Sequence, residues 1–328
     1  MKKKIKVAIV GSNFGLKCYL PVVKKINKLD LKVICSRNID KIKKNLNDIK
    51  NFDCIDDWKE IFKKNIDILV CAVPPKVQEK ILIYNLKFKK KIIFEKPISS
   101  NLKKSIKLVE NLKKNKINCE VNLTYLFHPL FKKVKNIIDK KALGNVNDFD
   151  IKWSFTSYDF NKKIRSWKTL ESDGGGIKNI FLTHVFSYCQ FFFGQIKLNN
   201  YDCEKVTFKR NVYKKKINCQ LSTLKDIKGN IFISTKKKGF QDHNIKIFFE
   251  NGYINLRNNS SDWTRDFILK IFYKKTNKFR YFKNPSFKKF KDGRSELIYF
   301  LFTKFLKKSN YNNLHYCLNA EKINNKII

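Results

Sequence analysis

The sequence predicts an α/β protein, with a doubly wound parallel sheet in residues 1–121 followed by an α+β domain with a mostly antiparallel sheet in residues 122–328. In the first third, short apolar runs alternate with helical patterns, which is typical of a parallel sheet covered by helices on both faces. Beyond that point, strand-like runs follow one another across Asn- and Gly-containing turns, which indicates antiparallel pairing. With 328 residues, 43% of them hydrophobic, the chain can form two cores.

The N-terminal elements follow from apolar runs and from the helical spacing between them. Strands are expected at residues 6–10, 31–35, 66–73, 91–94 and 118–123, and helices at 16–29, 40–49, 58–62, 77–86 and 102–115. Right-handed crossovers between such strands place ligands at the carboxyl ends of the strands. Any cofactor site should therefore lie in the residues that directly follow the strands.

The C-terminal elements show a different pattern. Helices are expected at residues 131–140, 177–193, 294–308 and 318–328, and strands at 146–157, 230–234, 245–249 and 253–256, within a strand-rich stretch from 205 to 281. Asn251-Gly252 marks a tight turn between two of these strands. A polar, Gly-containing loop is expected between residues 159 and 176.

The charge of the chain is extreme and suggests nucleic acid as a ligand. Lys and Arg outnumber Asp and Glu by 71 to 28, a formal net charge of +43. Most of the basic residues are Lys and are spread over nearly every segment, whereas specific nucleic-acid readers rely on Arg. We therefore expect solvated Lys faces that attract anionic ligands, and no specific nucleic-acid partner.

Cysteine and histidine usage bears on compartment and metals. The nine cysteines form no C-x-x-C pair and lie mostly in apolar runs, which indicates reduced, buried thiols in a cytoplasmic protein. None of the four histidines has ligand spacing to a cysteine, so no metal site is expected. No apolar run reaches the length of about 18 residues that a membrane span needs, so no membrane partner is expected.

The first predicted strand ends in Gly11-Ser12-Asn13-Phe14-Gly15. A strand that stops at Gly and opens a helix points N–H groups at an anion such as a pyrophosphate. The dinucleotide fingerprint has a glycine where Asn13 stands, although Asn tolerates positive φ better than most residues. We expect these five residues to bind a cofactor; an ordinary turn is the alternative.

Ser36 and Arg37 follow the second predicted strand. Sites selective for NAD place an acidic residue here to bind the ribose 2′-hydroxyl, whereas Ser followed by Arg suits a 2′-phosphate. The pair therefore predicts that NADP(H) is preferred, with NAD(H) possible. The alternative is that both residues simply begin a loop.

Two further strands end in Pro74-Pro75 and in Glu95-Lys96. A Lys is costly to bury, and this one stands where ligands bind in such folds. Desolvation and a positively charged nicotinamide would lower the pKa of Lys96, so it could pass a proton to or from a substrate hydroxyl. The alternative is a surface strand end in a Lys-rich chain. We expect Pro74, Pro75, Glu95 and Lys96 to contact the cofactor.

Three consecutive glycines, Gly174 to Gly176, precede an apolar helix that contains His184. Glycines in a row allow another backbone or a ligand to approach closely. His184 lies two helical turns into the helix. Taken alone, such a histidine is more often a satisfied core residue than a functional one.

These motifs together resemble the Gfo/Idh/MocA oxidoreductases, the family of glucose–fructose oxidoreductase and inositol dehydrogenase. The likeness runs over essentially the whole chain, and its most specific part is Glu-Lys-Pro after an apolar strand combined with the spacing from GGG to His. The corresponding positions are Val7 to Gly15 with Lys17, Tyr19 and Pro21, then Pro74 and Pro75 followed by Gln78, which stands where the family has a His, then Glu95-Lys96-Pro97, and then Trp167, Gly174 to Gly176 and His184.

The resemblance implies a Rossmann domain and a C-terminal domain whose sheet forms a substrate wall and often an oligomer interface, so a homo-oligomer is expected. It implies hydride transfer between nicotinamide C4 and a carbinol carbon of a sugar, polyol or sugar derivative. Lys96 would bind the reacting oxygen, and His184 would act as general acid/base or orient the hydroxyl. Trp167, Lys168 and Asn179 would belong to the substrate site.

Four positions depart from the family pattern. The usual Asp four residues before the His is Ile180, the Gly two before it is Leu182, an Arg is replaced by Leu126, and the first-turn His is Tyr19. Loss of the Asp removes a carboxylate that would help to ionise or orient the substrate hydroxyl. The alternative function is therefore an NAD(P)-binding member of the same fold without catalysis.

Overall fold

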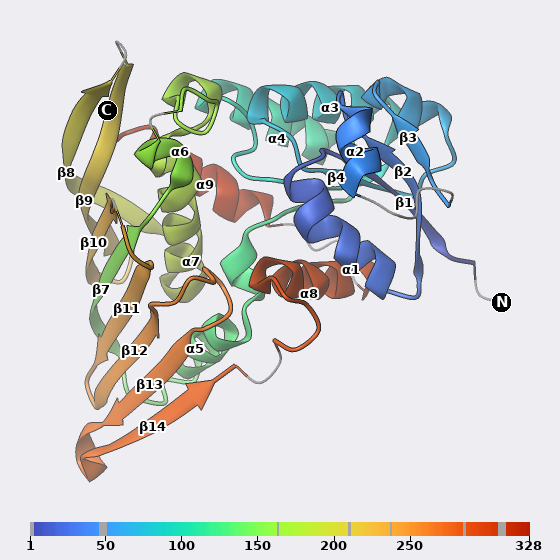
Figure 1. The fold of residues 1–328 in the computed structure, drawn as a ribbon. Helices are drawn as coiled ribbons and strands as arrows, with labels where there is room; N and C mark the ends of the chain where they lie inside the picture. The colour runs from blue at the N-terminus through green and yellow to red at the C-terminus, as the bar shows by residue number, and fades with distance from the viewer. Residues whose placement is uncertain are drawn as a thin grey trace. The chain divides into compact units, whose positions relative to one another are not determined.

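The computed structural model describes residues 3–45, 51–162, 164–208, 211–236, 238–284, 287–307 and 313–328. The chain folds as two compact units (Figure 1). Unit 1 comprises Met1–Leu123 and Ile298–Leu318, and unit 2 comprises Thr124–Leu297 and Asn319–Ile328. The sequence predicts two contiguous stretches, whereas unit 1 also takes in a segment from near the carboxyl end of the chain. The segment contributes buried apolar side chains such as Leu301 and Phe302, and Phe302 packs edge-to-face on Tyr19 with ring centroids 6.4 Å apart.

Unit 1 contains a six-stranded parallel sheet in the order β3-β2-β1-β4-β5-β6. Its strands are β1 (Ile5–Val10), β2 (Leu29–Cys35), β3 (Asp53–Ile55), β4 (Ile68–Cys71), β5 (Lys91–Phe94) and β6 (Cys119–Val121). All four residues of β4 are buried, as expected for an inner strand covered on both faces. The strand order reverses at β1, which pairs with β2 on one side and with β4 on the other.

Helices lie on both faces of this sheet. They are η1 (Gly15–Tyr19), α1 (Leu20–Lys25), α2 (Ile39–Asn45), η2 (Trp58–Lys63), α3 (Pro75–Phe88) and α4 (Leu102–Lys114). Figure 1 shows α1 on one face and α3 with α4 on the other. The doubly wound parallel sheet predicted from the sequence is confirmed.

The first helix differs from its prediction over residues 16–29. The structure has a π-helical turn, η1, followed by α1, and the helical conformation ends at Ile26, whose backbone is extended (φ −88°, ψ 105°). The prediction was too long because Leu29 belongs to β2, where it pairs with Ile5. Of the helix predicted at 40–49, residues 46–49 lie outside the described part of the chain.

Unit 2 contains an eight-stranded sheet in the order β14-β13-β12-β11-β7-β10-β9-β8. Its strands are β7 (Val146–Phe155), β8 (Ile196–Phe208), β9 (Asn211–Thr223), β10 (Lys228–Thr235), β11 (Asp242–Phe249), β12 (Gly252–Asn258), β13 (Ile268–Tyr273) and β14 (Lys278–Lys283). Among the described strands of this sheet, only β7 and β10 pair in parallel, so the predicted mostly antiparallel sheet is confirmed. The predicted turn at Asn251-Gly252 joins β11 to β12.

The remaining elements are helical. They are η3 (Thr124–Phe127), α5 (Pro129–Asp139), α6 (Tyr158–Asn161), η4 (Glu171–Asp173), η5 (Lys178–Leu182), α7 (Thr183–Phe193), η6 (Lys274–Thr276), α8 (Gly293–Lys307) and α9 (Leu314–Asn324). Figure 1 shows α5 and α7 along one face of the eight-stranded sheet. Alternate residues of β7, namely Phe149, Ile151, Trp153 and Phe155, are buried, which is the period expected of a sheet with one covered face.

Candidate active site

The glycine turn lies at the carboxyl end of β1, where the strand order reverses and where ligands bind in open α/β sheets. Gly11 has φ 120°, and a Cβ atom there would lie 2.2 Å from the carbonyl oxygen of Ala72, so only glycine fits. A Cβ atom on Gly15 would lie 3.0 Å from Ile9 Cγ2, so this glycine lets the helix pack closely on the strand.

Two of the three glycine roles in a dinucleotide-binding turn are therefore present. The third position, which faces the pyrophosphate, holds Asn13, and its side chain is exposed. Positive φ in this turn occurs at Gly11 and not at Asn13, so the replacement needs no unusual backbone. Ser12 and Phe14 are half-buried, and the Phe14 ring packs edge-to-face on Tyr19 at 5.8 Å. The turn fits a dinucleotide.

Ser36 and Arg37 directly follow β2. The Ser36 N–H donates to the carbonyl of Ile55 at 2.9 Å, and the Ser36 hydroxyl accepts from Asn38 N–H at 3.2 Å, whereas the Arg37 side chain is exposed. Burial, and after it the negative charges of Asp57 and Asp56, raise the pKa of Cys35 at the end of β2 to about 12. Two carboxylates therefore lie near this strand end. Charges of both signs therefore surround the position expected to select the ribose.

The Pro-Pro pair begins α3. Pro74 is its N-cap and Pro75 its first residue, where a missing N–H costs nothing. The first turn of this helix carries Gln78, which is 1% exposed. Gln78 Nε2 donates to the carbonyl oxygens of Glu95, Pro97 and Ile98 at 2.7, 2.9 and 3.1 Å.

Glu95 and Lys96 directly follow β5. The Glu95 carboxylate accepts hydrogen bonds at Oε1 from the Tyr19 hydroxyl (2.6 Å) and from Asn122 Nδ2 (2.9 Å). Lys96 is half-buried, and burial lowers its pKa to about 8, although the neighbouring Glu95 acts in the opposite direction. A lysine with this pKa can both give and take a proton near neutral pH.

The glycine run in unit 2 allows a close backbone approach, as the sequence predicts. A Cβ atom on Gly175 would lie 1.9 Å from the carbonyl oxygen of Trp167, and the Gly176 N–H donates to the Lys168 carbonyl at 2.8 Å. The run therefore packs directly on the Trp167-Lys168 backbone. Trp167 is half-buried, while Lys168 is exposed and its Nζ lies 3.2 Å from an Asp159 carboxylate oxygen.

Asn179 lies in the π-helical turn η5, immediately before α7. Its Nδ2 donates to the Gly175 carbonyl at 2.9 Å, so its amide fixes the glycine run. Such π-turns are rare and are frequent at functional sites. His184, in the first turn of α7, is half-buried, and its ring lies edge-to-face on Tyr125 with centroids 5.3 Å apart.

Two other histidines of unit 2 are fully buried, unlike His184. His128 accepts from Leu130 N–H at Nδ1 and lies 3.0 Å from the Thr264 carbonyl at Nε2, and burial lowers its pKa to about 3. His243 stacks on Trp153 at 4.2 Å, and burial lowers its pKa to about 3 as well. Both are core residues, whereas His184 is partly accessible.

Several of these contact residues were missed by the sequence analysis. Tyr125 packs against His184, Trp153 and His243, but nothing in its local sequence marks it. Asn122 directly follows β6, but the sequence predicts a strand through residue 123, so only the structure places Asn122 at the carboxyl end of the strand, where ligands bind.

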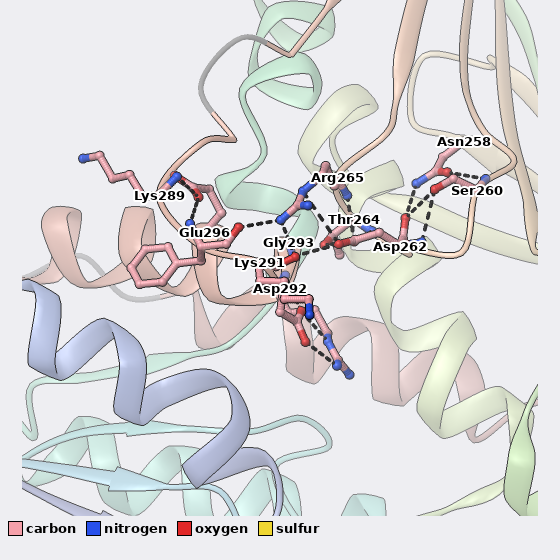
Figure 2. Close-up of polar contacts among 12 residues, drawn as sticks. Asn258, Ser260, Asp262, Thr264, Arg265, Lys289, Lys291, Asp292, Gly293 and Glu296 are labelled. Carbon is pink, nitrogen blue, oxygen red and sulfur yellow. Dashed lines mark hydrogen bonds and ion pairs between the residues drawn. The ribbon is translucent and has the colours of Figure 1, made fainter. Parts of the chain in front are cut away.

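A polar network fixes the segment between β12 and β13 to the start of α8 (Figure 2). Asp262 Oδ1 accepts from the N–H groups of Thr264 and Arg265, both at 3.0 Å, and its Oδ2 accepts from Gly293 N–H at 2.9 Å. Arg265 donates in turn to the Phe290 carbonyl. These bonds are all internal to unit 2 and act as a structural clamp.

The described residues contain neither a metal-binding cluster nor a membrane-spanning helix. Within the described ranges, no group of three or more His, Cys, Asp or Glu side chains is arranged to bind a metal ion. No helix in the same ranges is long and apolar enough to cross a membrane.

Comparisons with known proteins agree with this architecture. The model of the oxidoreductase family with an NAD-binding Rossmann fold matches residues 5–123, and that of the GFO/IDH/MocA C-terminal domain matches residues 131–255. Oxidoreductase P35 of Formosa agariphila is 24% identical over 206 residues, which cover 60% of this chain and 63% of that protein. The chain spans 33%, 42% and 63% of the lengths of the curated relatives it matches.

Solved structures share the fold over nearly the whole chain. Levoglucosan dehydrogenase, in complex with NADH and levoglucosan, is 16% identical with a TM-score of 0.83, covering 99% of this chain and 96% of that one. KijD10, a 3-ketoreductase from Actinomadura kijaniata in complex with NADP and TDP-benzene, is 14% identical with a TM-score of 0.80, covering 98% and 96%. The two family matches, at residues 5–123 and 131–255, show that the chain belongs to the Gfo/Idh/MocA family of NAD(P)-binding oxidoreductases.

Proposed function

We propose that this protein transfers a hydride between a nicotinamide cofactor and a carbinol carbon of a sugar, polyol or sugar derivative. The observation that carries the proposal is Lys96, a half-buried amine with its pKa lowered to about 8, at the carboxyl end of an inner strand. In this fold, ligands bind at that edge. The fold is shared with a levoglucosan dehydrogenase and a 3-ketoreductase, which supports a sugar-like substrate.

Residues of unit 1 would bind the cofactor. Gly11 to Gly15 would approach the pyrophosphate, while Pro74, Pro75 and Glu95 would line the nicotinamide side. Ser36 and Arg37 would contact a ribose 2′-phosphate, so NADP(H) is the preferred cofactor in this proposal and NAD(H) the weaker one. When bound, the cofactor supplies the acceptor or the donor of the hydride.

Lys96 would handle the proton of the reaction. During oxidation, the neutral amine accepts the hydroxyl proton as the C–H hydride leaves the carbinol carbon. During reduction, the ammonium returns that proton to the forming hydroxyl. His184 would act as a second acid/base or orient the hydroxyl, and Trp167, Lys168 and Asn179 would belong to the substrate site.

Turnover on a panel of sugars, polyols and nucleotide sugars tests this function. Absorbance at 340 nm follows the reduction of NADP⁺ or the oxidation of NADPH with each compound. Turnover that is lost in Lys96→Ala supports the proposal. NADPH binding without turnover on any compound contradicts it.

The second candidate is a cofactor-binding protein without catalysis. It is favoured by Ile180, an aliphatic residue in η5 where the family has an acidic one. General acid–base groups are worth about 10²–10⁴-fold in rate, so one missing carboxylate slows a reaction without abolishing it. The same substrate panel separates the two candidates.

We also propose that the protein forms a homo-oligomer through the face of the eight-stranded sheet opposite α5 and α7. Rings from four neighbouring strands line up on the sheet, with centroid distances of 6.2, 5.2 and 4.9 Å between successive members. The series is Phe248, Tyr253, Phe272 and Phe279. Phe279 is 40% exposed, so part of its ring is open to a partner. Light scattering of the native protein should give a mass above 39.0 kDa.

A further inference from the structure

The side chain of Gln78 makes four hydrogen bonds to one short stretch of backbone. Its Nε2 donates to the carbonyl oxygens of Glu95, Pro97 and Ile98 at 2.7, 2.9 and 3.1 Å, and its Oε1 accepts from Glu95 N–H at 2.9 Å. Gln78 is 1% exposed, so water does not replace these bonds. The amide therefore fixes the backbone on both sides of Lys96.

The backbone of residues 95–98 depends on a side chain because the sheet has ended. β5 stops at Phe94, so ladder hydrogen bonds no longer fix the chain beyond it, and Pro97 has no N–H to donate. Buried carbonyl groups that lack a donor are costly. One amide with two N–H groups donates to three carbonyls here, and few other side chains could do so.

The Glu95 side chain is fixed separately from its backbone. Tyr19 and Asn122 both donate to its Oε1. Loss of the Gln78 amide would therefore act on the backbone that carries Lys96, while the carboxylate of Glu95 keeps its own two donors.

We propose that Gln78 is a positioning residue for the reaction, because it sets the backbone from which the Lys96 amine reaches the substrate oxygen. This inference rests on the proposed function of Lys96. Proton transfer needs the two heavy atoms within hydrogen-bond reach, and a misplacement of about 1 Å costs about 10²-fold in rate. Gln78 itself does not act on the substrate.

The same helix offers a matched control. Asn85, also on α3 and 0% exposed, clamps the other end of β5: its Nδ2 donates to the Lys90 carbonyl at 2.9 Å, and its Oδ1 accepts from Lys90 N–H at 3.1 Å. Both residues are buried amides that fix backbone next to one strand. Only Gln78 acts at the end that carries Lys96.

The experiment compares Gln78→Glu with Asn85→Asp in the full-length protein. Each replacement keeps the shape of the side chain and removes its N–H donors. Both variants should unfold at a lower temperature. Only Gln78→Glu should lose kcat, by about 10²-fold, while its KM for the cofactor changes less than its kcat. If Gln78→Glu does not fold, Gln78→Met takes its place.

Equal losses of kcat in the two variants, or no loss in either, would overturn the inference. If the native protein turns over no compound, the proposed function has failed, and chemical labelling of Lys96 then decides the role of Gln78. Acetic anhydride is applied at a series of pH values, and the Lys96 peptide is quantified by mass spectrometry. Gln78→Glu should change the labelling midpoint or extent, and Asn85→Asp should leave both unchanged. Identical labelling in all three proteins would refute the inference.

Discussion

The Tyr19 hydroxyl donates a 2.6 Å hydrogen bond to Oε1 of Glu95, the residue immediately before Lys96. Burial, together with the charge of Glu95, raises the pKa of Tyr19 well above its ordinary value, so the phenol keeps its proton. Asn122 donates to the same oxygen at 2.9 Å. Two neutral donors thus stabilise the Glu95 carboxylate, and its negative charge limits how far burial lowers the pKa of Lys96.

Removal of the Lys96 amine should stop proton transfer without disturbing the fold. Lys96→Ala should lower kcat by about 10²–10⁴-fold, because water is a poor substitute for a positioned acid/base. The melting temperature should stay close to that of the native protein, since Lys96 is only half-buried. Lys91→Ala, at the exposed start of β5, is the control and should keep full activity.

The reaction should depend on pH in opposite senses in its two directions. The pKa of Lys96 is lowered to about 8 by burial, so the amine is mostly charged below pH 8 and mostly neutral above it. Oxidation needs the neutral amine and should speed up as pH rises through about 8. Reduction needs the ammonium and should slow down over the same range. Parallel pH profiles in the two directions would show that Lys96 is not the proton carrier.

Glu120 should make the protein less stable as pH rises. It is 1% exposed in β6, and neither carboxylate oxygen has a hydrogen-bond partner among the described residues. Burial raises its pKa to about 9, although Lys304 acts in the opposite direction. Between its unfolded pKa of about 4.3 and about 9, the folded protein binds one proton more than the unfolded chain, so stability falls with pH.

A single proton corresponds to a slope of about 1.4 kcal/mol per pH unit. Glu120→Gln cannot titrate, so urea unfolding from pH 6 to pH 9 should show a shallower loss of stability in this variant than in the native protein. Glu110→Gln, on the exposed side of α4, should leave the slope unchanged. An unchanged slope in Glu120→Gln would mean that the buried carboxyl does not retain its proton.

Arg37 should set the preference between the two cofactors. Its exposed guanidinium follows β2 and would pair with a 2′-phosphate. Arg37→Ala should weaken NADPH binding by about tenfold, equivalent to about 1.4 kcal/mol, and leave NADH binding nearly unchanged. An equal loss for both cofactors would remove the argument for NADP(H), and Asp56 and Asp57 would then be the residues to examine at this strand end.

Features that are encoded in a short stretch of consecutive residues could be predicted from the sequence. Apolar strands followed by Gly11, by the proline pair or by Glu95-Lys96 form local patterns, so the doubly wound sheet and the positions at its carboxyl edge followed from the sequence. The role of Gly175 could be predicted too. Three consecutive glycines in a chain that has only eleven indicate that another group lies very close to the backbone there. The structure identifies the Trp167 carbonyl as the group approached.

Residues that act through the tertiary fold could not be predicted. Gln78, Asn122 and Tyr19 lie 17, 27 and 76 positions from Glu95, and only the strand order brings them to it. Tyr19 and Gln78 stand where the family has histidines, and both contact the Glu95–Ile98 segment. From sequence these positions count as separate departures, whereas in the structure they belong to one cluster around the backbone of Lys96.

A fluorescence titration of the native protein with NADPH and with NADH, at physiological salt, shows whether this chain binds a nicotinamide cofactor and which of the two it prefers. We expect saturable binding of both cofactors, with NADPH bound more tightly, because the turn at Gly11 fits a pyrophosphate and Arg37 follows β2. Failure of either cofactor to bind at millimolar concentration would contradict the claim that this chain uses its Rossmann fold for nicotinamide chemistry.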